Sequence, residues 1–553
     1  MTHRAGALAL LCLTAPLAAQ VAPVPSDPSG PVSRDWDAID RRSDAAALRA
    51  SIRFLADDLL EGRSPGSRGD ALARLYLATR LQGAGFLPAG VEGGWEQPVP
   101  IIGVTAKVSS PLSATGKDGT RLGFVAPDDY TCQAGRAEPR SEWRQAGLVF
   151  VGYGITAPEQ RWDDWKGVDV RGKVVLVMNN DPESDPELFA GKRRLYYGRW
   201  SYKYEEAARR GAIGAIVIHT TPSAGYPFQV IQAGQGGEHF ALPPAEGVPS
   251  LAIQAWCSED AARKLAQLGG HDLDTLRAQA ETRAFAPVDL GVTLDLATEN
   301  SSREIRSANV IGLLRGSDPK LRDEHVVVTA HFDHLGRGRE RNRDDLYNGA
   351  VDNASGCGAA LELARVLGGL DPAPRRSVLV VFVTGEESGL IGSRWYAQTP
   401  TVPIRSIVAN FNLDGMNIWG ATEDLEMIGH GKSELSALAD TVAKRRGRRI
   451  EADKQPELGL FYRSDHFSFA QVGVPSAYFK AGGDFLENRE GRQRLKASYT
   501  TVHYHQPSDQ YDPRWLLDGA AADLRLIVEC LVRCADADAP PRWTPGDEFE
   551  ARR

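Results

Sequence analysis

Apolar runs bounded by glycine mark predicted strands in the middle of the chain. The clearest are residues 147–154 and 172–178, and a third follows at residues 211–218. Short apolar runs between turn residues are typical of buried strands. A helix-like stretch over residues 204–210 leads into the third run, and glycine and proline then crowd residues 222–249. This part of the chain is therefore predicted to form a separate α+β unit.

Residues 43–90 show helical spacing instead. Good helix formers fill residues 70–82, with leucine at four positions, Leu72, Leu75, Leu77 and Leu81. Glycine and proline between residues 83 and 88 end this helix. The preceding residues 20–42 begin with a Pro-, Ser- and Asp-rich stretch, which predicts a linker.

From about residue 305, predicted strands alternate with helices. The strands are expected at residues 326–329, 378–383, 407–413 and 476–479, and the clearest helix at residues 358–367. Such alternation predicts an α/β fold with a doubly wound, mixed but mainly parallel sheet covered on both faces.

The chain length agrees with more than one domain. It has 553 residues, beyond the roughly 250–300 at which a single core stops growing. We expect one larger domain built from segments 43–115 and 291–540, an inserted smaller α+β domain at 116–290, and a tail at 541–553. Apolar residues make up 42% and charged residues 25%, which excludes disorder as the dominant state, and the net charge of −8 argues against a nucleic-acid binder.

The N-terminus has the pattern of a secretory signal peptide. Arg4 precedes the apolar run Ala5 to Leu13, and small residues follow up to Ala19. We predict a signal over residues 1–19 and an exported protein, secreted or periplasmic; a frayed apolar terminus is the alternative. No other run approaches the roughly 20 apolar residues of a membrane span. Cys530 and Cys534, four residues apart, are interpreted as small buried side chains.

Polar residues follow the predicted strands of the C-terminal half repeatedly. His331 and Asp333 follow the first strand, Glu386 and Glu387 the second, and Asp414 the third. Asp352 lies in a glycine-rich turn before a helix, and Tyr504 and His505 come near the end. Because functional groups gather at the carboxyl edge of such a sheet, these side chains are expected to converge. Imidazole and carboxylate ligands suit zinc, and two zinc ions held together form a hydrolytic site.

These motifs carry a family resemblance. His331-x-Asp333, Asn348-Gly-Ala-Val-Asp352-Asn-Ala-Ser-Gly356, Gly385-Glu386-Glu387-x-Gly389, Asn412-Leu-Asp414 and Tyr504-His505 resemble the motif series of the co-catalytic zinc aminopeptidases and glutamate carboxypeptidases. Leu60-Glu-Gly-Arg63-Ser-Pro-Gly66 resembles a leader segment of bacterial members. The predicted insert resembles the protease-associated domain of this family.

The resemblance implies a role for each residue. His331 and Asp414 would bind one zinc, Glu387 and His505 the other, and Asp352 would bridge them. Glu386 would be the general base, Asp333 would orient His331, and Tyr504 would lie near the scissile carbonyl. His503 and His466 compete with His505 for the last ligand position, and the Tyr-His pattern favours His505.

Two other segments leave alternatives open. The connection from Gly336 to Leu346, with Arg337, Arg339, Arg341 and Arg343, is either a solvated loop or a binding element for an acidic substrate group. The aromatic and basic stretch over residues 196–204 fits packing within the insert or a wall of the substrate cleft. A nucleic-acid platform is disfavoured by the acidic balance.

The function expected from these residues is an exported zinc exopeptidase acting on peptides, foremost an aminopeptidase. A carboxypeptidase or dipeptidase with the same metal chemistry is the nearest rival. A glutaminyl cyclase is disfavoured by the complete two-metal ligand set, and a serine hydrolase by the absence of a GxSxG motif. A catalytically silent, receptor-like binding protein would be expected to have lost ligands. The sequence does not define the oligomeric state.

Overall fold

The computed structural model describes residues 32–235, 238–244, 247–338 and 345–552. The predicted signal peptide and three arginines of the 336–346 connection, Arg339, Arg341 and Arg343, lie outside these residues. Of that connection, β14 (Gly336–Arg337) pairs with β15 (Leu346–Tyr347), and Arg337 forms an ion pair of 3.1 Å with Asp345.

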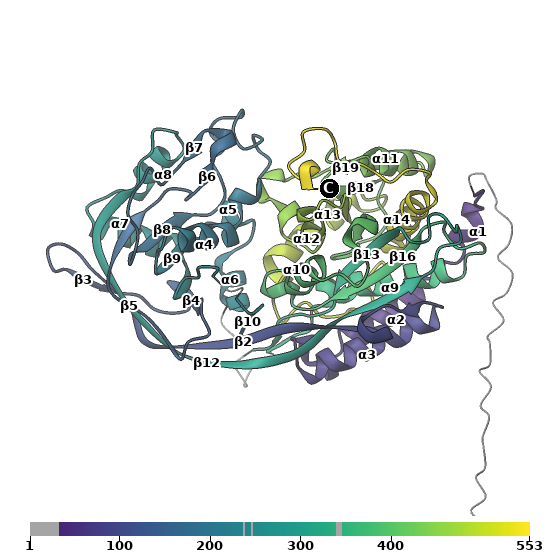
Figure 1. The fold of residues 1–553 in the computed structure, drawn as a ribbon, viewed down its shortest axis with the longest axis horizontal. Coiled ribbons are helices and arrows are strands. Elements are labelled where there is room, and N and C mark those ends of the chain that lie inside the picture. Colours follow the sequence, from purple (N-terminus) through teal and green to yellow (C-terminus); the bar gives the residue numbers. More distant parts are fainter. Residues whose placement is uncertain (1–31, 236–237, 245–246, 339–344, 553) are drawn as a thin grey trace, which may run out of the picture. The chain divides into compact units, whose positions relative to one another are not determined.

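One mixed sheet forms the framework of the described chain (Figure 1). In its C-terminal part four strands lie parallel, in the spatial order β20 (Ser476–Ala481), β17 (Ile407–Asn412), β13 (His325–His331) and β16 (Ser377–Val383). Antiparallel strands flank them, β12 (Val288–Leu314) beside β16 and β18 (Asp424–Ile428) beside β20, with β19 (Arg449–Ala452) outermost. The predicted α/β fold with a mixed, mainly parallel sheet is confirmed.

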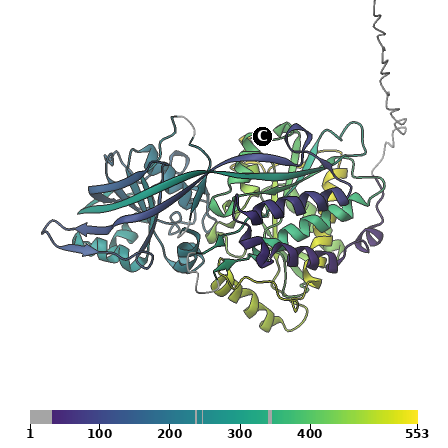
Figure 2. The ribbon, with the colours of Figure 1, turned by 90° about the horizontal axis from the view of Figure 1, so that it is seen from below.

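Apolar residues on both faces of the central strands explain why helices cover both sides. On β13, Val326 and Val328 pack into one core, whereas Val327 packs into another. The first core includes residues of α2 (Ala45–Leu55), α3 (Arg68–Gly83), α9 (Gly356–Gly368) and α14 (Asp518–Asp536). The second includes residues of α10 (Ile391–Gln398) and α12 (His466–Gln471). Figure 2 shows the N-terminal helices, in purple, lying on one side of the strands.

The middle of the chain forms a second parallel set of strands in the same sheet. These are β5 (Arg140–Phe150), β8 (Val174–Met178), β9 (Gly214–Ile218) and β11 (Ile253–Cys257), with β4 (Tyr130–Ala134) antiparallel at the edge. The helices α4 (Trp200–Arg209), α7 (Glu259–Leu268) and α8 (Leu273–Ala280) contribute residues to its two cores. The three predicted strands of this region match β5, β8 and β9.

Two long strands join the two parallel sets. β2 (Glu96–Thr115) pairs with β12 along almost its whole length, and β12 also pairs with β5 at one end and β16 at the other. The predicted domain boundary at residues 290/291 falls within β12. The domain boundaries, and the likeness of the insert to a protease-associated domain, stay predictions.

Shorter elements complete the described chain. They are the helices α1 (Trp36–Asp40), α5 (Thr221–Ala224), α6 (Phe228–Gln235), α11 (Leu435–Arg445) and α13 (Arg489–Ser498), the strands β1 (Leu87–Pro88), β3 (Arg121–Gly123), β6 (Thr156–Ala157), β7 (Trp162–Asp163) and β10 (His239–Ala241), and short helical turns, among them η1 (Asp58–Arg63), η5 (Ala350–Ser355), η6 (Glu386–Ser388) and η10 (Tyr499–His503). Cys530 and Cys534 are buried free thiols in α14, as interpreted. No helix within the described ranges has the length and apolar character needed to cross a membrane.

The helix α3 offers a direct test of the first core. Leu77 is fully buried, whereas Leu75, two residues earlier on the same helix, is 65% exposed. Leu77→Ala is expected to lower the free energy of unfolding by about 2–5 kcal/mol, because it leaves a cavity. Leu75→Ala is the matched control and should change it by less than about 0.5 kcal/mol. Equal effects of the two variants in urea unfolding would contradict this packing.

Candidate metal centre

The carboxyl ends of three neighbouring strands meet at one cluster of polar side chains. His331 is the last residue of β13, Glu386 and Glu387 form the turn η6 after β16, and Asp414 follows β17. Asp352 comes from the turn η5 before α9, and His505 from the segment after η10. The structure thus brings together residues that the sequence separates widely.

Two histidines lie on opposite sides of Asp352. Nε2 of His331 is 3.2 Å from Asp352 Oδ1 and 3.4 Å from Asp414 Oδ1. Nε2 of His505 is 3.3 Å from Asp352 Oδ2 and 2.9 Å from Glu387 Oε2. The two oxygens of one carboxylate therefore face two different groups of ligand atoms.

Asp333 contacts His331 through its backbone carbonyl, and not through the carboxylate that was expected to orient the ring. The ring of His331 donates from Nδ1 to the backbone carbonyl of Asp333 at 3.2 Å, whereas the Asp333 carboxylate is 3.8 Å away. That carboxylate instead accepts a hydrogen bond from the backbone N–H of Glu386 at 3.1 Å. Asp333 therefore contacts both His331 and the turn that carries Glu386 and Glu387.

His334 belongs to the cluster, although the sequence interpretation gave it no role. Its Nδ1 lies 2.5 Å from Oε1 of Glu387, and its ring centroid is 5.7 Å from that of His505. With Asp352 and Glu387 it forms a group whose ligand atoms lie within 4.8 Å of one another. The only sequence signal was its position three residues after His331, in the polar segment that follows the strand.

The environment shifts the pKa values of the two adjacent glutamates in opposite directions. Burial, together with the Glu387 and Asp465 carboxylates, raises the pKa of Glu386 well above its usual range. Burial also acts on Glu387, but the neighbouring histidines His505 and His334 outweigh it and lower its pKa to about 2. Opposed shifts in neighbouring carboxyl groups are typical of sites that assign them different roles.

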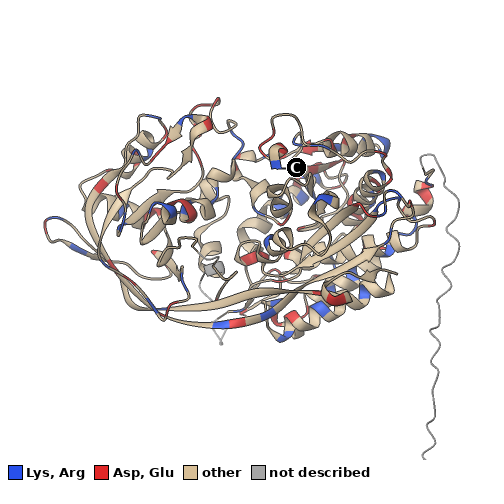
Figure 3. Cartoon of the chain, viewed as in Figure 1, with Lys and Arg blue, Asp and Glu red and all other residues tan. Residues whose placement is uncertain are grey.

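The donor set fits divalent metal ions. Buried or half-buried carboxylates from four positions and imidazoles from three converge within a few ångströms. Such a concentration of negative charge is costly to remove from water without cations. Elsewhere on the described chain acidic and basic residues are interspersed (Figure 3). Imidazole and carboxylate ligands are those that zinc accepts.

Comparison with known proteins agrees with this geometry. Residues 309–526 match the description "Peptidase family M28", and this range includes every clustered residue. This segment belongs to peptidase family M28. That is the family of co-catalytic zinc peptidases, so the resemblance inferred from the motifs is confirmed.

Individual relatives are distant. The chain is 24% identical over 418 residues to the rat aminopeptidase NAALADL1, covering 66% of this chain and 51% of the relative. It is 27% identical over 213 residues to a probable zinc metalloprotease of Leptosphaeria maculans, covering 38% and 48%. The chain thus spans about half the length of these curated relatives. An aminopeptidase structure from Aneurinibacillus sp. strain AM-1 shares the fold, with 20% identity, coverage of 93% and 97%, and a TM-score of 0.53.

A cleft opens beside the clustered M28 residues. A cavity of about 230 Å³ is lined by Asp352, Glu386 and Asp414 together with apolar and aromatic side chains, among them Met416, Trp419, Tyr478 and Tyr499. A second cavity of about 120 Å³ adjoins Glu386, Glu387 and His505. Tyr504 lines both cavities, and its ring stacks on that of His505 at 4.0 Å.

Residues from the middle of the chain line this cleft as well. Tyr226 lines both cavities, and Arg199 and Trp200 line the second. The ring of Tyr196 packs against a core of the middle region and also on the ring of Phe467 in α12, with the two ring centroids 5.3 Å apart. The aromatic stretch over residues 196–204 therefore supplies both packing and part of the cleft wall.

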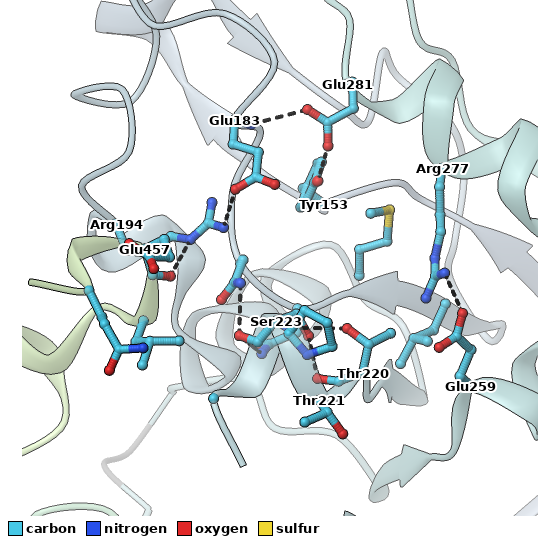
Figure 4. A pocket seen from close by; sticks show the side chains of 18 of the residues that line it. Tyr153, Glu183, Arg194, Thr220, Thr221, Ser223, Glu259, Arg277, Glu281 and Glu457 are labelled. Atoms are coloured by element: carbon cyan, nitrogen blue, oxygen red, sulfur yellow. Dashed lines mark hydrogen bonds and ion pairs between the residues drawn. The ribbon is translucent and has the colours of Figure 1, made fainter. Parts of the chain in front are cut away.

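A larger cavity of about 770 Å³ lies at the carboxyl ends of β8 and β9 (Figure 4). Four of its charged side chains form ion pairs: Arg194 with Glu183 at 3.0 Å and Arg277 with Glu259 at 2.7 Å. Gln455 and Leu458 line both this cavity and the first cleft cavity. The segment around residue 456 therefore separates the two cavities and lines both. Nε of Arg194 donates a hydrogen bond of 2.7 Å to the Glu457 carbonyl of this segment.

The two competing histidines lie apart from the cluster's ligand atoms. His503 contacts Ser508 Oγ at 3.0 Å. His466 is fully buried against the ring of Phe461, and burial lowers its pKa to about 3. Of the three histidines considered, His505 is the one that the structure places beside Asp352 and Glu387.

Proposed function

We propose that the chain is an exported two-zinc exopeptidase that removes N-terminal residues from peptides. The observation that carries this proposal is Asp352, whose two oxygens face His331 with Asp414 on one side and His505 with Glu387 on the other. Such an arrangement suits two ions bridged by one carboxylate. The exported location rests on the predicted signal peptide.

His331 and Asp414 would hold one zinc, Glu387 and His505 the other, and Asp352 both. His334 contacts Glu387 and would orient it. When bound, the two ions supply Lewis-acid activation of the attacking water and of the peptide carbonyl. Glu386 would accept the proton of that water and return it to the leaving amine.

The opposed pKa shifts support this division of roles between the adjacent glutamates. A metal ligand must be ionised, and the pKa of Glu387 is lowered to about 2. A general base works best with a pKa near the working pH, and the pKa of Glu386 is raised. The Tyr504 side chain, in both cleft cavities, would face the scissile carbonyl.

Chelation tests the metal requirement and the substrate class together. The mature protein should hydrolyse a panel of aminoacyl-p-nitroanilides, lose this activity with a chelator, and regain it when zinc is returned. The apolar and aromatic side chains of the first cavity predict the highest kcat/KM for large apolar residues. Hydrolysis that is insensitive to chelation would overturn the proposal.

A carboxypeptidase or dipeptidase is the second candidate, and one observation favours it. Arg199 and Arg463 both line the cavity beside Glu387 and His505. Arg463 donates to the Ala224 carbonyl at 2.8 Å and lies over the ring of Tyr226. Guanidinium groups at this place suit a substrate carboxylate. Cleavage of N-acetylated peptides with a free C-terminus, but not of C-terminally amidated peptides, would establish this alternative.

A further inference from the structure

A buried arginine from the N-terminal segment reaches two of the segments that carry the clustered residues, the one after His331 and the one before Asp352. Arg63 is fully buried at the end of η1. Its Nε donates to the carbonyl of Phe332 at 2.6 Å, and its terminal nitrogens donate to the carbonyls of Asn348 at 2.6 Å and Gly349 at 3.1 Å. A further bond reaches the Leu55 carbonyl. One planar group thus binds carbonyls of both loops and of α2.

The carbonyls that Arg63 binds lie close in sequence to two of the clustered residues. Phe332 directly follows His331, and Gly349 lies three residues before Asp352. The guanidinium therefore sets the spacing between the backbone that carries His331 and the backbone that carries Asp352. A rigid fork of donors suits this task, whereas a lysine ammonium offers a single centre.

The carboxylate of Asp509 binds the loop before Asp352 through the backbone N–H groups of that loop. Its carboxylate accepts from Val351 N at 3.0 Å and from Asp352 N at 3.1 Å, and the Tyr499 hydroxyl donates to it at 3.0 Å. The loop over residues 348–352 is thus bound through its carbonyls by Arg63 and through its amides by Asp509. Neither side chain is among the clustered ligand atoms.

The backbone around Arg63 is itself constrained. Glu61, Gly62 and Arg63 have positive φ values of 49°, 68° and 54°, a conformation that costs about 1–2 kcal/mol for each residue with a side chain. A Cβ added at Gly62 would lie 2.4 Å from the Tyr347 carbonyl, so the two backbones are in direct contact. The surroundings hold this costly conformation in place, and it delivers the guanidinium to the two loops.

We propose that Arg63 and Asp509 are positioning residues of the metal centre, which set the distance between His331 and Asp352 without contacting substrate. The inference rests on the proposed two-zinc site. Loss of either side chain leaves buried carbonyls or amides without partners and lets the ligand loops separate. Residues that orient metal ligands without binding the metal themselves typically contribute about 10–100-fold to metal affinity. An effect of roughly this size is expected here.

The test compares two buried arginines in the full-length mature protein. Arg376 is also buried and donates to backbone carbonyls, among them Ala535, but it precedes β16, about 20 Å from the turn that follows this seven-residue strand. Zinc dissociation constants are measured by competition with a chromophoric chelator for wild type, Arg63→Lys and Arg376→Lys. Urea unfolding of the zinc-free proteins gives the stability of each.

Arg63→Lys should bind zinc about 10–100-fold more weakly than wild type, whereas Arg376→Lys should lose stability but keep wild-type affinity. Unchanged affinity in Arg63→Lys, or equal losses in both variants, would overturn the inference. If Arg63→Lys does not fold, Asp509→Asn takes its place with the same expected and opposing results. A wild type that binds no zinc would overturn the proposed function itself, which separates the two failures.

Discussion

Glu386→Gln is expected to lower kcat by about 10²–10⁴-fold while zinc binding stays at the wild-type level. The amide keeps the size of the side chain and its place in the cleft, but it does not accept a proton from the attacking water. In the structure Glu386 is the more distant carboxylate, with Oε2 4.0 Å from His331 Nε2 against 3.2 Å for Asp352 Oδ1. Its loss should therefore spare the ligand set.

The measurement is single-substrate kinetics on zinc-loaded protein, with zinc content determined in the same samples. Glu434→Gln is a matched control, because Glu434 forms an ion pair with Arg542 at 2.8 Å and takes no part in the cluster. Turnover of zinc-loaded Glu386→Gln at the rate of this control would remove Glu386 from the role of general base.

Asp352→Ala should abolish turnover and remove zinc from both positions. The two oxygens of Asp352 face both groups of ligand atoms, so one substitution takes a ligand from each. Asp414→Ala is the comparison, since Asp414 lies beside His331 at 3.4 Å and should affect one ion alone. Zinc stoichiometry by atomic absorption after dialysis distinguishes them. Retention of both ions in Asp352→Ala would rule out the bridging position.

Local pattern was sufficient for much of this fold. The apolar runs at residues 326–329 and 378–383 lie in β13 and β16, because short runs rich in β-branched residues between turn signals fit buried strands. The order of polar residues after these strands also predicted which side chains gather, since parallel strands end at a common edge. His331, Asp352, Glu387, Asp414 and His505 do lie together.

Contacts that depend on tertiary placement were not predictable in this way. His334 approaches Glu387 only because the chain turns after β13, and Asp333 uses its carbonyl rather than its carboxylate toward His331. Arg63 lies in the segment that resembles a leader motif, but its partners Phe332 and Gly349 are 269 and 286 residues away. No local pattern encodes such separations. The antiparallel pairing of β12 with β16 and of β18 with β20 also depends on the assembled sheet.

The 27-residue strand β12 has a mechanical consequence. A segment tethered by flexible linkers would lose entropy each time it met the cleft. Here β12 is hydrogen-bonded to β5 at one end and to β16 at the other, with β2 alongside. A ribbon of paired strands can twist and bend, but its strands do not slide past one another. A shift of one residue in register would move every side chain of the strand to the opposite face of the sheet. The region that contains Tyr226 and Arg199 is thus joined rigidly to the rest of the sheet. The conformational entropy of this connection is lost during folding and not when a peptide binds.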